Sequence, residues 1–279
     1  ISRNNSGGIV SNLNGPNNTP PAPPVVVENN VLNLTVGGPA LTDINTLDAN
    51  GDVGIGVNVT GNGRANVNIA NATITNTTDG PDTTLNGDGI NLRRSDSSLL
   101  TAVITNVTST GNAGDGLDVD AQGTDRFNPN QPMSGTANSV TVTKSAFNNN
   151  GLNGASYRVR GNATLIGGAA NSSFNNNGQN GVIVQTSQFS SFGDPSIGLP
   201  PGQRSLFDSN TYNDNGVDGV QLVASEDSRI LAEITSTAVA GGGSPHAGAN
   251  TNGNSSISRN GRDGARITTT GGHSDILIT

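Results

Sequence analysis

Short stretches of alternating apolar and polar residues recur along this chain, and several begin directly after a glycine. In one of them, Ile55 and Val57 are apolar and the residues between and beside them are not large hydrophobics. A period of two is typical of a β-strand with one buried face, so we expect the apolar residues to point inward. Residues 65–69, 72–75 and 139–143 form further short stretches of this kind, whereas no stretch has the period of an amphipathic helix.

The turn that precedes these strands follows a repeated pattern, Asn-Gly-x-Asn/Asp-Gly. The final glycine predicts a backbone site that either has positive φ or is too crowded for a Cβ. The first Asn recurs at one place in seven copies, and stacked Asn side chains can hydrogen-bond from coil to coil as a ladder. The glycines are Gly8, Gly54, Gly89, Gly116, Gly154, Gly181, Gly219 and Gly264, and the asparagines are Asn4, Asn50, Asn112, Asn150, Asn177, Asn215 and Asn260.

The segments between the turns hold two further short strands, so each repeat supplies three strands. We therefore predict an all-β fold: a right-handed, single-stranded parallel β-helix, or three-sided β-solenoid, of about eight coils. Residues 1–279 would form a single domain. Phe147, Phe174 and Tyr212 occupy one position of the repeat and are expected to stack.

Composition leaves disorder as the main alternative to a solenoid. Only 31% of the residues are hydrophobic and 3% are aromatic, which is little for a compact globule to bury. A solenoid needs fewer hydrophobic residues than a globule, because each coil buries a thin apolar layer against its neighbours. The periodicity of the chain favours the solenoid.

Four segments rich in Pro, Gly, Ser and Asn interrupt the repeats and are predicted to be loop insertions. Three of them, near 12–24, 123–136 and 187–204, follow the strand after the Asn-Gly turn. We expect these three to leave one corner of the solenoid, and the fourth, near 240–253, to leave another.

The repeated turns resemble those of parallel β-helices in the pectin-lyase-like superfamily, and equally the repeat regions of large bacterial extracellular and surface proteins. The resemblance covers nearly the whole chain and implies the fold. It does not imply one activity, because this fold serves lyases, hydrolases and adhesins alike.

One group of residues could carry enzymatic chemistry. Asp118 and Asp120 alternate with inward residues and should lie on the outer face, with Arg93 and Arg158 in register with Asp120. Such a group resembles the acidic-sugar groove of pectate-lyase-like enzymes, in which Asp residues hold Ca²⁺ and a basic residue abstracts a proton. The alternative, which we favour, is a charge ladder of Arg93, Asp120 and Arg158 that settles the register of the strands.

Further comparison with that superfamily argues against an enzyme. The paired Asp, Gly-His-Gly and Arg-x-Lys signatures of polygalacturonase-like hydrolases are missing. We therefore predict no catalytic residues and no required cofactor. A weak Ca²⁺ candidate is the group Asp115, Asp118 and Asp120, although solvated acids are the usual reading of such a group.

Charge and hydrophobicity argue against two classes of partner, nucleic acids and membranes. The net charge is −8 with a single lysine, so there is no basic stripe for a nucleic acid. No apolar stretch is long enough to span a membrane as a helix. The absence of cysteine is compatible with an extracellular protein.

The two ends of the sequence share one phase of the repeat: residues 1–4 and residues 257–260 both read Ile-Ser-Arg-Asn, and neither end carries a recognisable cap. The sequence therefore predicts either a slice of a longer solenoid or head-to-tail stacking of subunits through Ile1, Ile9, Ile276 and Ile278. We expect an extracellular or cell-surface structural protein, a fibre subunit or part of a stalk or adhesin. The alternative is a β-helix that binds or degrades polysaccharides, with surface glycans as partners.

Overall fold

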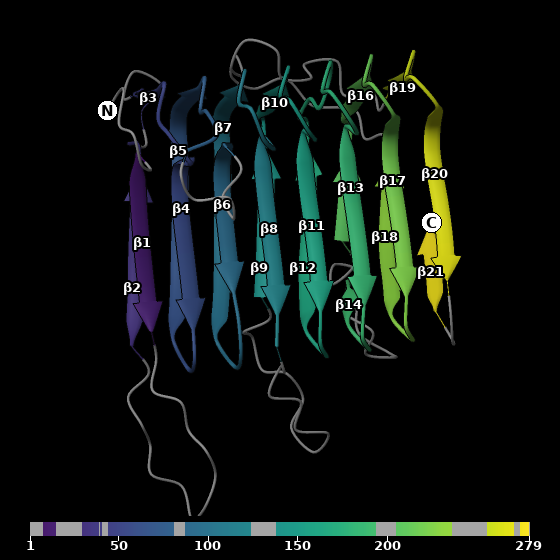
Figure 1. The fold of residues 1–279 in the computed structure, drawn as a ribbon, viewed down its shortest axis with the longest axis horizontal. Coiled ribbons are helices and arrows are strands. Elements are labelled where there is room, and N and C mark those ends of the chain that lie inside the picture. Colours follow the sequence, from purple (N-terminus) through teal and green to yellow (C-terminus); the bar gives the residue numbers. More distant parts are fainter. Residues whose placement is uncertain are drawn as a thin grey trace, which may run out of the picture.

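The computed structural model is a column of stacked β-strands (Figure 1). It describes residues 8–14, 30–38, 40, 44–80, 87–123, 138–193, 205–235, 256–270 and 274–278. All regular secondary structure in these ranges is β-strand, which confirms the predicted all-β class. Every pairing between the strands is parallel, with the strands stacked in the order of the repeats.

The first sheet contains eight strands, one from each coil, in the order of the chain. This sheet confirms a β-solenoid of about eight coils, and its strands point the same way in Figure 1. Its members are β1 (Ile9–Asn14), β4 (Val53–Thr60), β6 (Asp88–Arg94), β8 (Leu117–Gln122), β11 (Ala155–Arg160), β13 (Val182–Ser187), β17 (Asp218–Ser225) and β20 (Asp263–Thr270).

The other strands form the second and third sides of the column. Two of them, β5 and β7, belong to both sides because they bend at Asn71 and Asn106, which have φ of 49° and 55°. Asn adopts this left-handed conformation more readily than most residues. The second side contains β2 (Val31–Val36), β5 (Arg64–Thr75), β7 (Leu99–Thr110), β9 (Asn138–Thr143), β12 (Thr164–Ala170), β14 (Ser191–Phe192), β15 (Ser205–Asp208), β18 (Arg229–Thr235) and β21 (Asp275–Ile278). The third side adds β3 (Asn45–Asp48), β10 (Ala146–Asn148), β16 (Thr211–Asn213) and β19 (Ser256–Ser258).

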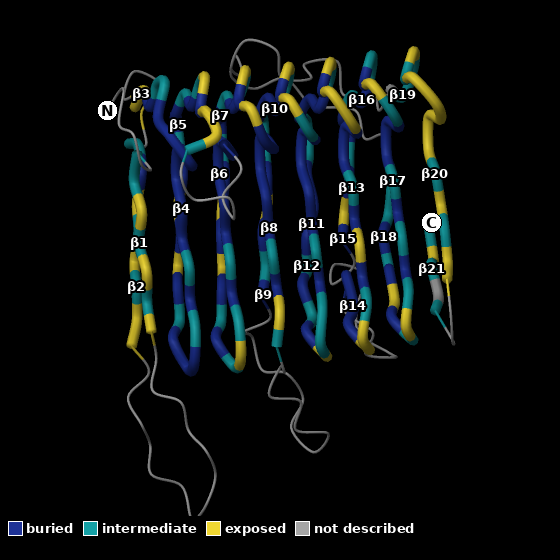
Figure 2. The backbone as a smooth tube through the Cα atoms, in the orientation of Figure 1, coloured by how far each residue is buried: buried dark blue, intermediate teal, exposed yellow. Residues whose placement is uncertain are grey.

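The core is a thin stack of inward side chains that runs the length of the column. The predicted inward residues Ile55 and Val57 are at most 2% exposed, and the layers above them repeat the arrangement. In Figure 2 the middle coils are largely buried, whereas the first and last coils are largely intermediate or exposed. Each coil is therefore covered by its two neighbours, as a solenoid requires.

Aromatic side chains stack inside the column as predicted. Phe147 and Phe174 have ring centroids 5.5 Å apart and an interplanar angle of 8°, and Phe174 and Tyr212 repeat this with 5.5 Å and 9°. Offset stacking at such distances stabilises the column in addition to the effect of burying the rings.

Crowding explains the repeated glycine. None of the eight glycines has positive φ, so the first of the two predicted reasons is wrong. In the first seven copies a Cβ would lie 2.5–2.8 Å from the carbonyl oxygen of the glycine one coil further on, closer than real Cβ contacts. Glycine at this position lets neighbouring coils approach to the spacing of a sheet.

The insertions agree only partly with the prediction. Strand β14 lies inside the range 187–204 and pairs with β12 and β18, so that segment re-enters the second side before residue 194. The strand β1 likewise extends to Asn14, inside the predicted loop 12–24. The rest of 12–24, most of 123–136 and all of 240–253 lie outside the described residues.

Candidate functional site

The Asn ladder is the most extensive polar feature of the column. Each Asn donates from its backbone N–H and its side-chain Nδ2 to the Oδ1 of the Asn in the next coil toward the C-terminus. For Asn177 these distances to Asn215 are both 3.0 Å. The run is continuous through Asn112, Asn150, Asn177, Asn215 and Asn260.

The ladder does not extend to all seven predicted members. Asn50 is fully buried, but its side-chain nitrogen and oxygen have no partner among the described residues. The next coil places Thr77 at this position, and its N–H donates to Asn112 Oδ1 at 3.1 Å. The Thr77 hydroxyl takes the place of the carboxamide and has no hydrogen-bond partner among the described residues, so the chain of side-chain bonds stops there. Asn4 lies outside the described residues.

A second ladder lies at the Asn or Asp directly before the crowded glycine. Here the backbone N–H donates to the Oδ1 of the preceding coil, so this ladder runs in the opposite direction to the first. Asn180, for example, donates from N and Nδ2 to Asn153 Oδ1 at 3.1 and 2.9 Å. The motif contained the signal, an Asn or Asp before the glycine, but the sequence analysis assigned it no role. Its members are Asp88, Asp115, Asn153, Asn180, Asp218 and Asp263.

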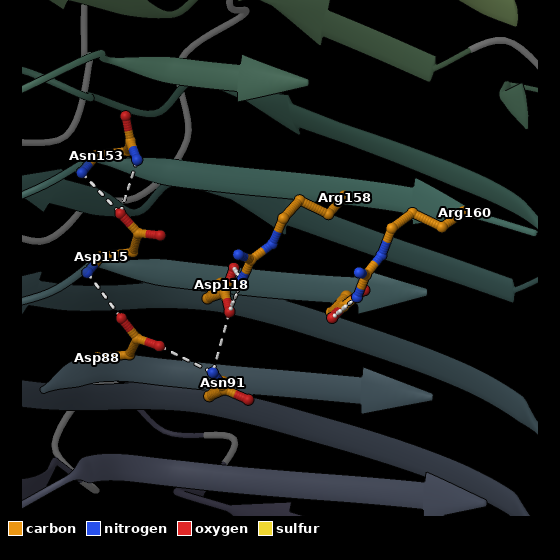
Figure 3. Close-up of polar contacts among 8 residues, drawn as sticks. Asp88, Asn91, Asp115, Asp118, Asn153, Arg158 and Arg160 are labelled. Atoms are coloured by element: carbon orange, nitrogen blue, oxygen red, sulfur yellow. Dashed lines mark hydrogen bonds and ion pairs between the residues drawn. The ribbon is translucent and has the colours of Figure 1, made fainter. Parts of the chain in front are cut away.

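Acids replace amides at both ends of the second ladder, and those at the N-terminal end, Asp88 and Asp115, are buried close together (Figure 3). Burial, with the nearby charges of Asp118 and Asp115, raises the pKa of Asp88 to about 8. Burial and the charge of Asp118 raise the pKa of Asp115 to about 7. Asn91 Nδ2 donates to both Asp88 and Asp118, at 2.8 and 3.1 Å, and links the two carboxyl groups.

The outer face of β6, β8 and β11 carries the residues considered for catalysis. The predicted register is confirmed, because Asp120 lies opposite Arg93 on one side and Arg158 on the other. The predicted ion pair between Arg158 and Asp120 is wrong. Arg158 reaches diagonally to Asp118 at 2.6 Å (Figure 3). Asp120 pairs instead with Arg160 at 2.6 Å. Side chains lean along the strand, which favours diagonal contacts between long residues.

Asp118 points outward from the core and is nevertheless 1% exposed. Burial raises its pKa, and the Arg158 and Arg93 guanidinium groups oppose that shift. A buried carboxylate held by Arg and Asn donors has no free oxygen directed at a substrate. The arrangement therefore serves best as a structural ion pair between coils.

The calcium candidate is not assembled. Among the described residues no group of three or more His, Asp or Glu side chains is arranged to hold a metal ion. Asp115 Oδ1 accepts two bonds from Asn153, at 2.7 and 2.9 Å, while Asp118 and Asp120 bind separate arginines. The three carboxyl groups thus face different partners and do not converge.

The C-terminal face of the column, formed by β20 with Asn260, Gly264 and Ile267, differs from the interior coils. Ile267 takes the inward position that Leu222 fills one coil earlier, and the two are 54% and 1% exposed. Asn260 Nδ2 is buried and has no hydrogen-bond partner among the described residues. Among the described strands, β20 pairs with β17 alone.

The four predicted end residues lie as follows. Ile276 and Ile278 pack partly buried against the core from β21, and Ile9 does so from β1 at the opposite end. Ile1 lies outside the described residues. Three of the four are therefore inward residues of the first or last coil.

No known protein family, no curated protein and no solved structure matches this chain. Within the described residues no helix is long and apolar enough to cross a membrane.

Proposed function

We propose that this chain is a structural β-solenoid subunit of an extracellular or cell-surface assembly that stacks head to tail into a fibre or stalk. The observation that carries the proposal is the regular stack of eight parallel coils joined by two ladders, of which β20 is the last described strand and leaves its inward Ile267 exposed. A parallel strand placed on this edge would bury that side chain and complete the backbone hydrogen bonds, as each coil does for the previous one.

The two ladders support a structural role for the column. Two ladders of buried amides and carboxyls run through neighbouring coils in addition to the backbone bonds, so each coil is joined to the next at several points. Satisfied buried polar networks of this kind fix register and rigidity. Among known proteins, we place the chain with the repeat regions of bacterial extracellular and surface proteins, whose turns it resembles.

Sedimentation velocity and negative-stain electron microscopy of the purified chain over a concentration series test the proposal. The expected result is rods of constant width that lengthen with protein concentration. Single rods of one coil-stack length at the highest concentration would contradict head-to-tail stacking.

The second candidate function is the binding of acidic polysaccharides. The observation in its favour is that the side chains of Arg158 and Arg160 remain 37% and 42% exposed on one outer face. Calorimetric titration with oligogalacturonate tests it: binding that is lost in Arg158→Ala and kept in Arg259→Ala would support this function. Equal behaviour of the two variants would exclude the face as a glycan site.

A further inference from the structure

The second side of the column differs from the first in its charge. Strands β2, β7, β9, β12 and β14 contain no charged residue, and β5 contains only Arg64, at its first position. Further charges on this side lie on β15, β18 and β21. The first side, in contrast, carries arginines and aspartates on β6, β8 and β11. Because the chain has a net charge of −8, two copies repel each other, and a face that is mostly uncharged is where they can approach closely.

The same face exposes large apolar side chains. Eight large hydrophobic residues are exposed in the described part of the chain, and half of them point outward from the second side: Val31, Val103, Leu206 and Leu277. The last three are 43–48% exposed although they lie within regular strands. Apolar side chains that gather on one face of a folded protein mark an interaction surface.

The register of the strands arranges the outward residues in rows along the column. Thr101, Ser139 and Ile166 lie side by side in one row, and the same row continues through Leu231 to Leu277. We call this the central row. On β7 it is flanked by Leu99 and Val103, and on β18 by Arg229 and Glu233, each two residues from it along the strand.

We infer that two copies of this chain pair side by side through the outer face of the second side, with their columns parallel and related by a two-fold axis along the central row. This inference goes beyond the proposed function, because side-by-side pairing does not need head-to-tail stacking. The occupant is a second copy because side chains that stand out from a sheet repeat every 4.8 Å or so along the column. A partner that packs against several strands at once has to share that repeat, as facing sheets do, and a second column has it.

The two-fold axis explains the residues that flank the central row. It sets the residue before the row in one copy against the residue after the row in the other. Leu99 then faces Val103, and Arg229 faces Glu233, so an apolar contact and an ion pair each form twice. Columns in opposite directions would set Arg229 and Glu233 against uncharged strands of the partner, so charge complementarity favours the parallel pair.

A single cysteine in the central row tests the axis, because the chain has no cysteine of its own. Thr101 is exposed, and the axis brings its two copies together. Facing sheets pack about 10 Å apart, so a short bis-maleimide can bridge two Thr101→Cys chains. We expect at least tenfold more covalent dimer than from the control Gln185→Cys, whose exposed position lies on β13 of the first side.

A charge placed beside the central row tests the apolar contact. Val103→Glu should raise the dimer dissociation constant at least tenfold in sedimentation equilibrium. It should leave the denaturant midpoint of the column unchanged, because Val103 points away from the core. The matched Val223→Glu places the same charge on the outer face of β17, on the first side, and should change neither quantity.

The outcomes separate this inference from the proposed function. Cross-links that form in Thr101→Cys and disappear when Val103→Glu is added would support the pairing. Equal cross-linking of Thr101→Cys and Gln185→Cys would overturn it. Rods that lengthen with concentration but keep the width of one column would overturn the pairing and leave head-to-tail stacking standing. Paired columns that do not lengthen would support the pairing and contradict the stacking.

Discussion

The second ladder has two regions with the same geometry and different chemistry. In the middle of the column Asn153 and Asn180 are amides that donate and accept, whereas nearer the N-terminus Asp88 and Asp115 offer carboxyls to the same backbone N–H groups. The amide region is neutral at any pH. The acid region holds protons because burial raises the pKa of Asp88 to about 8 and of Asp115 to about 7. The repeat therefore fixes the shape of the site, while the residue in it decides how the coil responds to pH.

Among the substitutions, placing an acid in the amide region should have the largest effect. Asn180→Asp removes the Nδ2 donor to Asn153 and buries a carboxyl group between two coils. We expect a loss of about 3 kcal/mol in the free energy of unfolding at pH 7.5, measured by urea denaturation. The loss should shrink at pH 4, where the new carboxyl is protonated, and a loss of equal size at both pH values would contradict this account.

The stability of the unmodified chain should also depend strongly on pH. In the folded column Asp88 and Asp115 keep their protons to about pH 8 and 7, whereas in the unfolded chain they lose them near pH 4. The unfolded state therefore binds fewer protons between these values, and stability falls as pH rises from 4 to 8. Each pKa unit corresponds to about 1.4 kcal/mol, so these shifts predict a decrease of roughly several kcal/mol, measured by urea denaturation at several pH values. Stability that rises over this range would contradict it.

Replacing an acid of this ladder by an amide should instead raise the free energy of unfolding. Asp115→Asn keeps the Oδ1 acceptor for Asn153 and adds a donor that can reach Asp88 Oδ1, as the amide pairs do. We expect a gain of roughly 1–2 kcal/mol at pH 8 and a flatter pH profile in the same urea series. Asn153→Ser, which removes an amide from the other region, is the matched control and should not flatten the profile.

The smallest effect should come from an acid that is only partly covered. Asp120 pairs with Arg160, whose side chain is 42% exposed. The substitution Arg160→Ala removes this ion pair and should lower the free energy of unfolding by only about 0.5 kcal/mol, because water screens such pairs. Arg158→Ala, which uncovers the buried Asp118, should cost clearly more under the same conditions. Equal costs would show that burial does not distinguish the two carboxyls.

The fold and the main ladder could be predicted from the sequence because they depend on features that repeat. The glycine, the Asn and the apolar alternation recur once per coil, and recurrence at fixed positions defines a solenoid. The break at Asn50 follows from a single Thr77 in a coil with an altered turn, which a pattern built from the other copies does not reveal.

The ion pairs and pKa values of the charged face could not be predicted as well from the sequence. Register placed Arg158 opposite Asp120 correctly, but the side chain reaches Asp118, two residues away along the neighbouring strand. The burial of Asp118 and the raised pKa values of Asp88 and Asp115 also depend on side chains from three coils together. Strand alternation gives the direction of a side chain and not the length over which it reaches.

The Asn-Gly turns have a consequence for the chemical stability of this protein against deamidation. Asn is among the thermolabile residues, and attack by the next residue's nitrogen on its side chain is easiest when that residue is glycine. In the ladder the nitrogens of Gly151, Gly178 and Gly216 each donate to a carbonyl one coil away at 2.8 Å, and the Asn carboxamides are held by their neighbours. At these three Asn-Gly dipeptides the attacking nitrogen is therefore already held in a hydrogen bond, and deamidation there requires the coil to open.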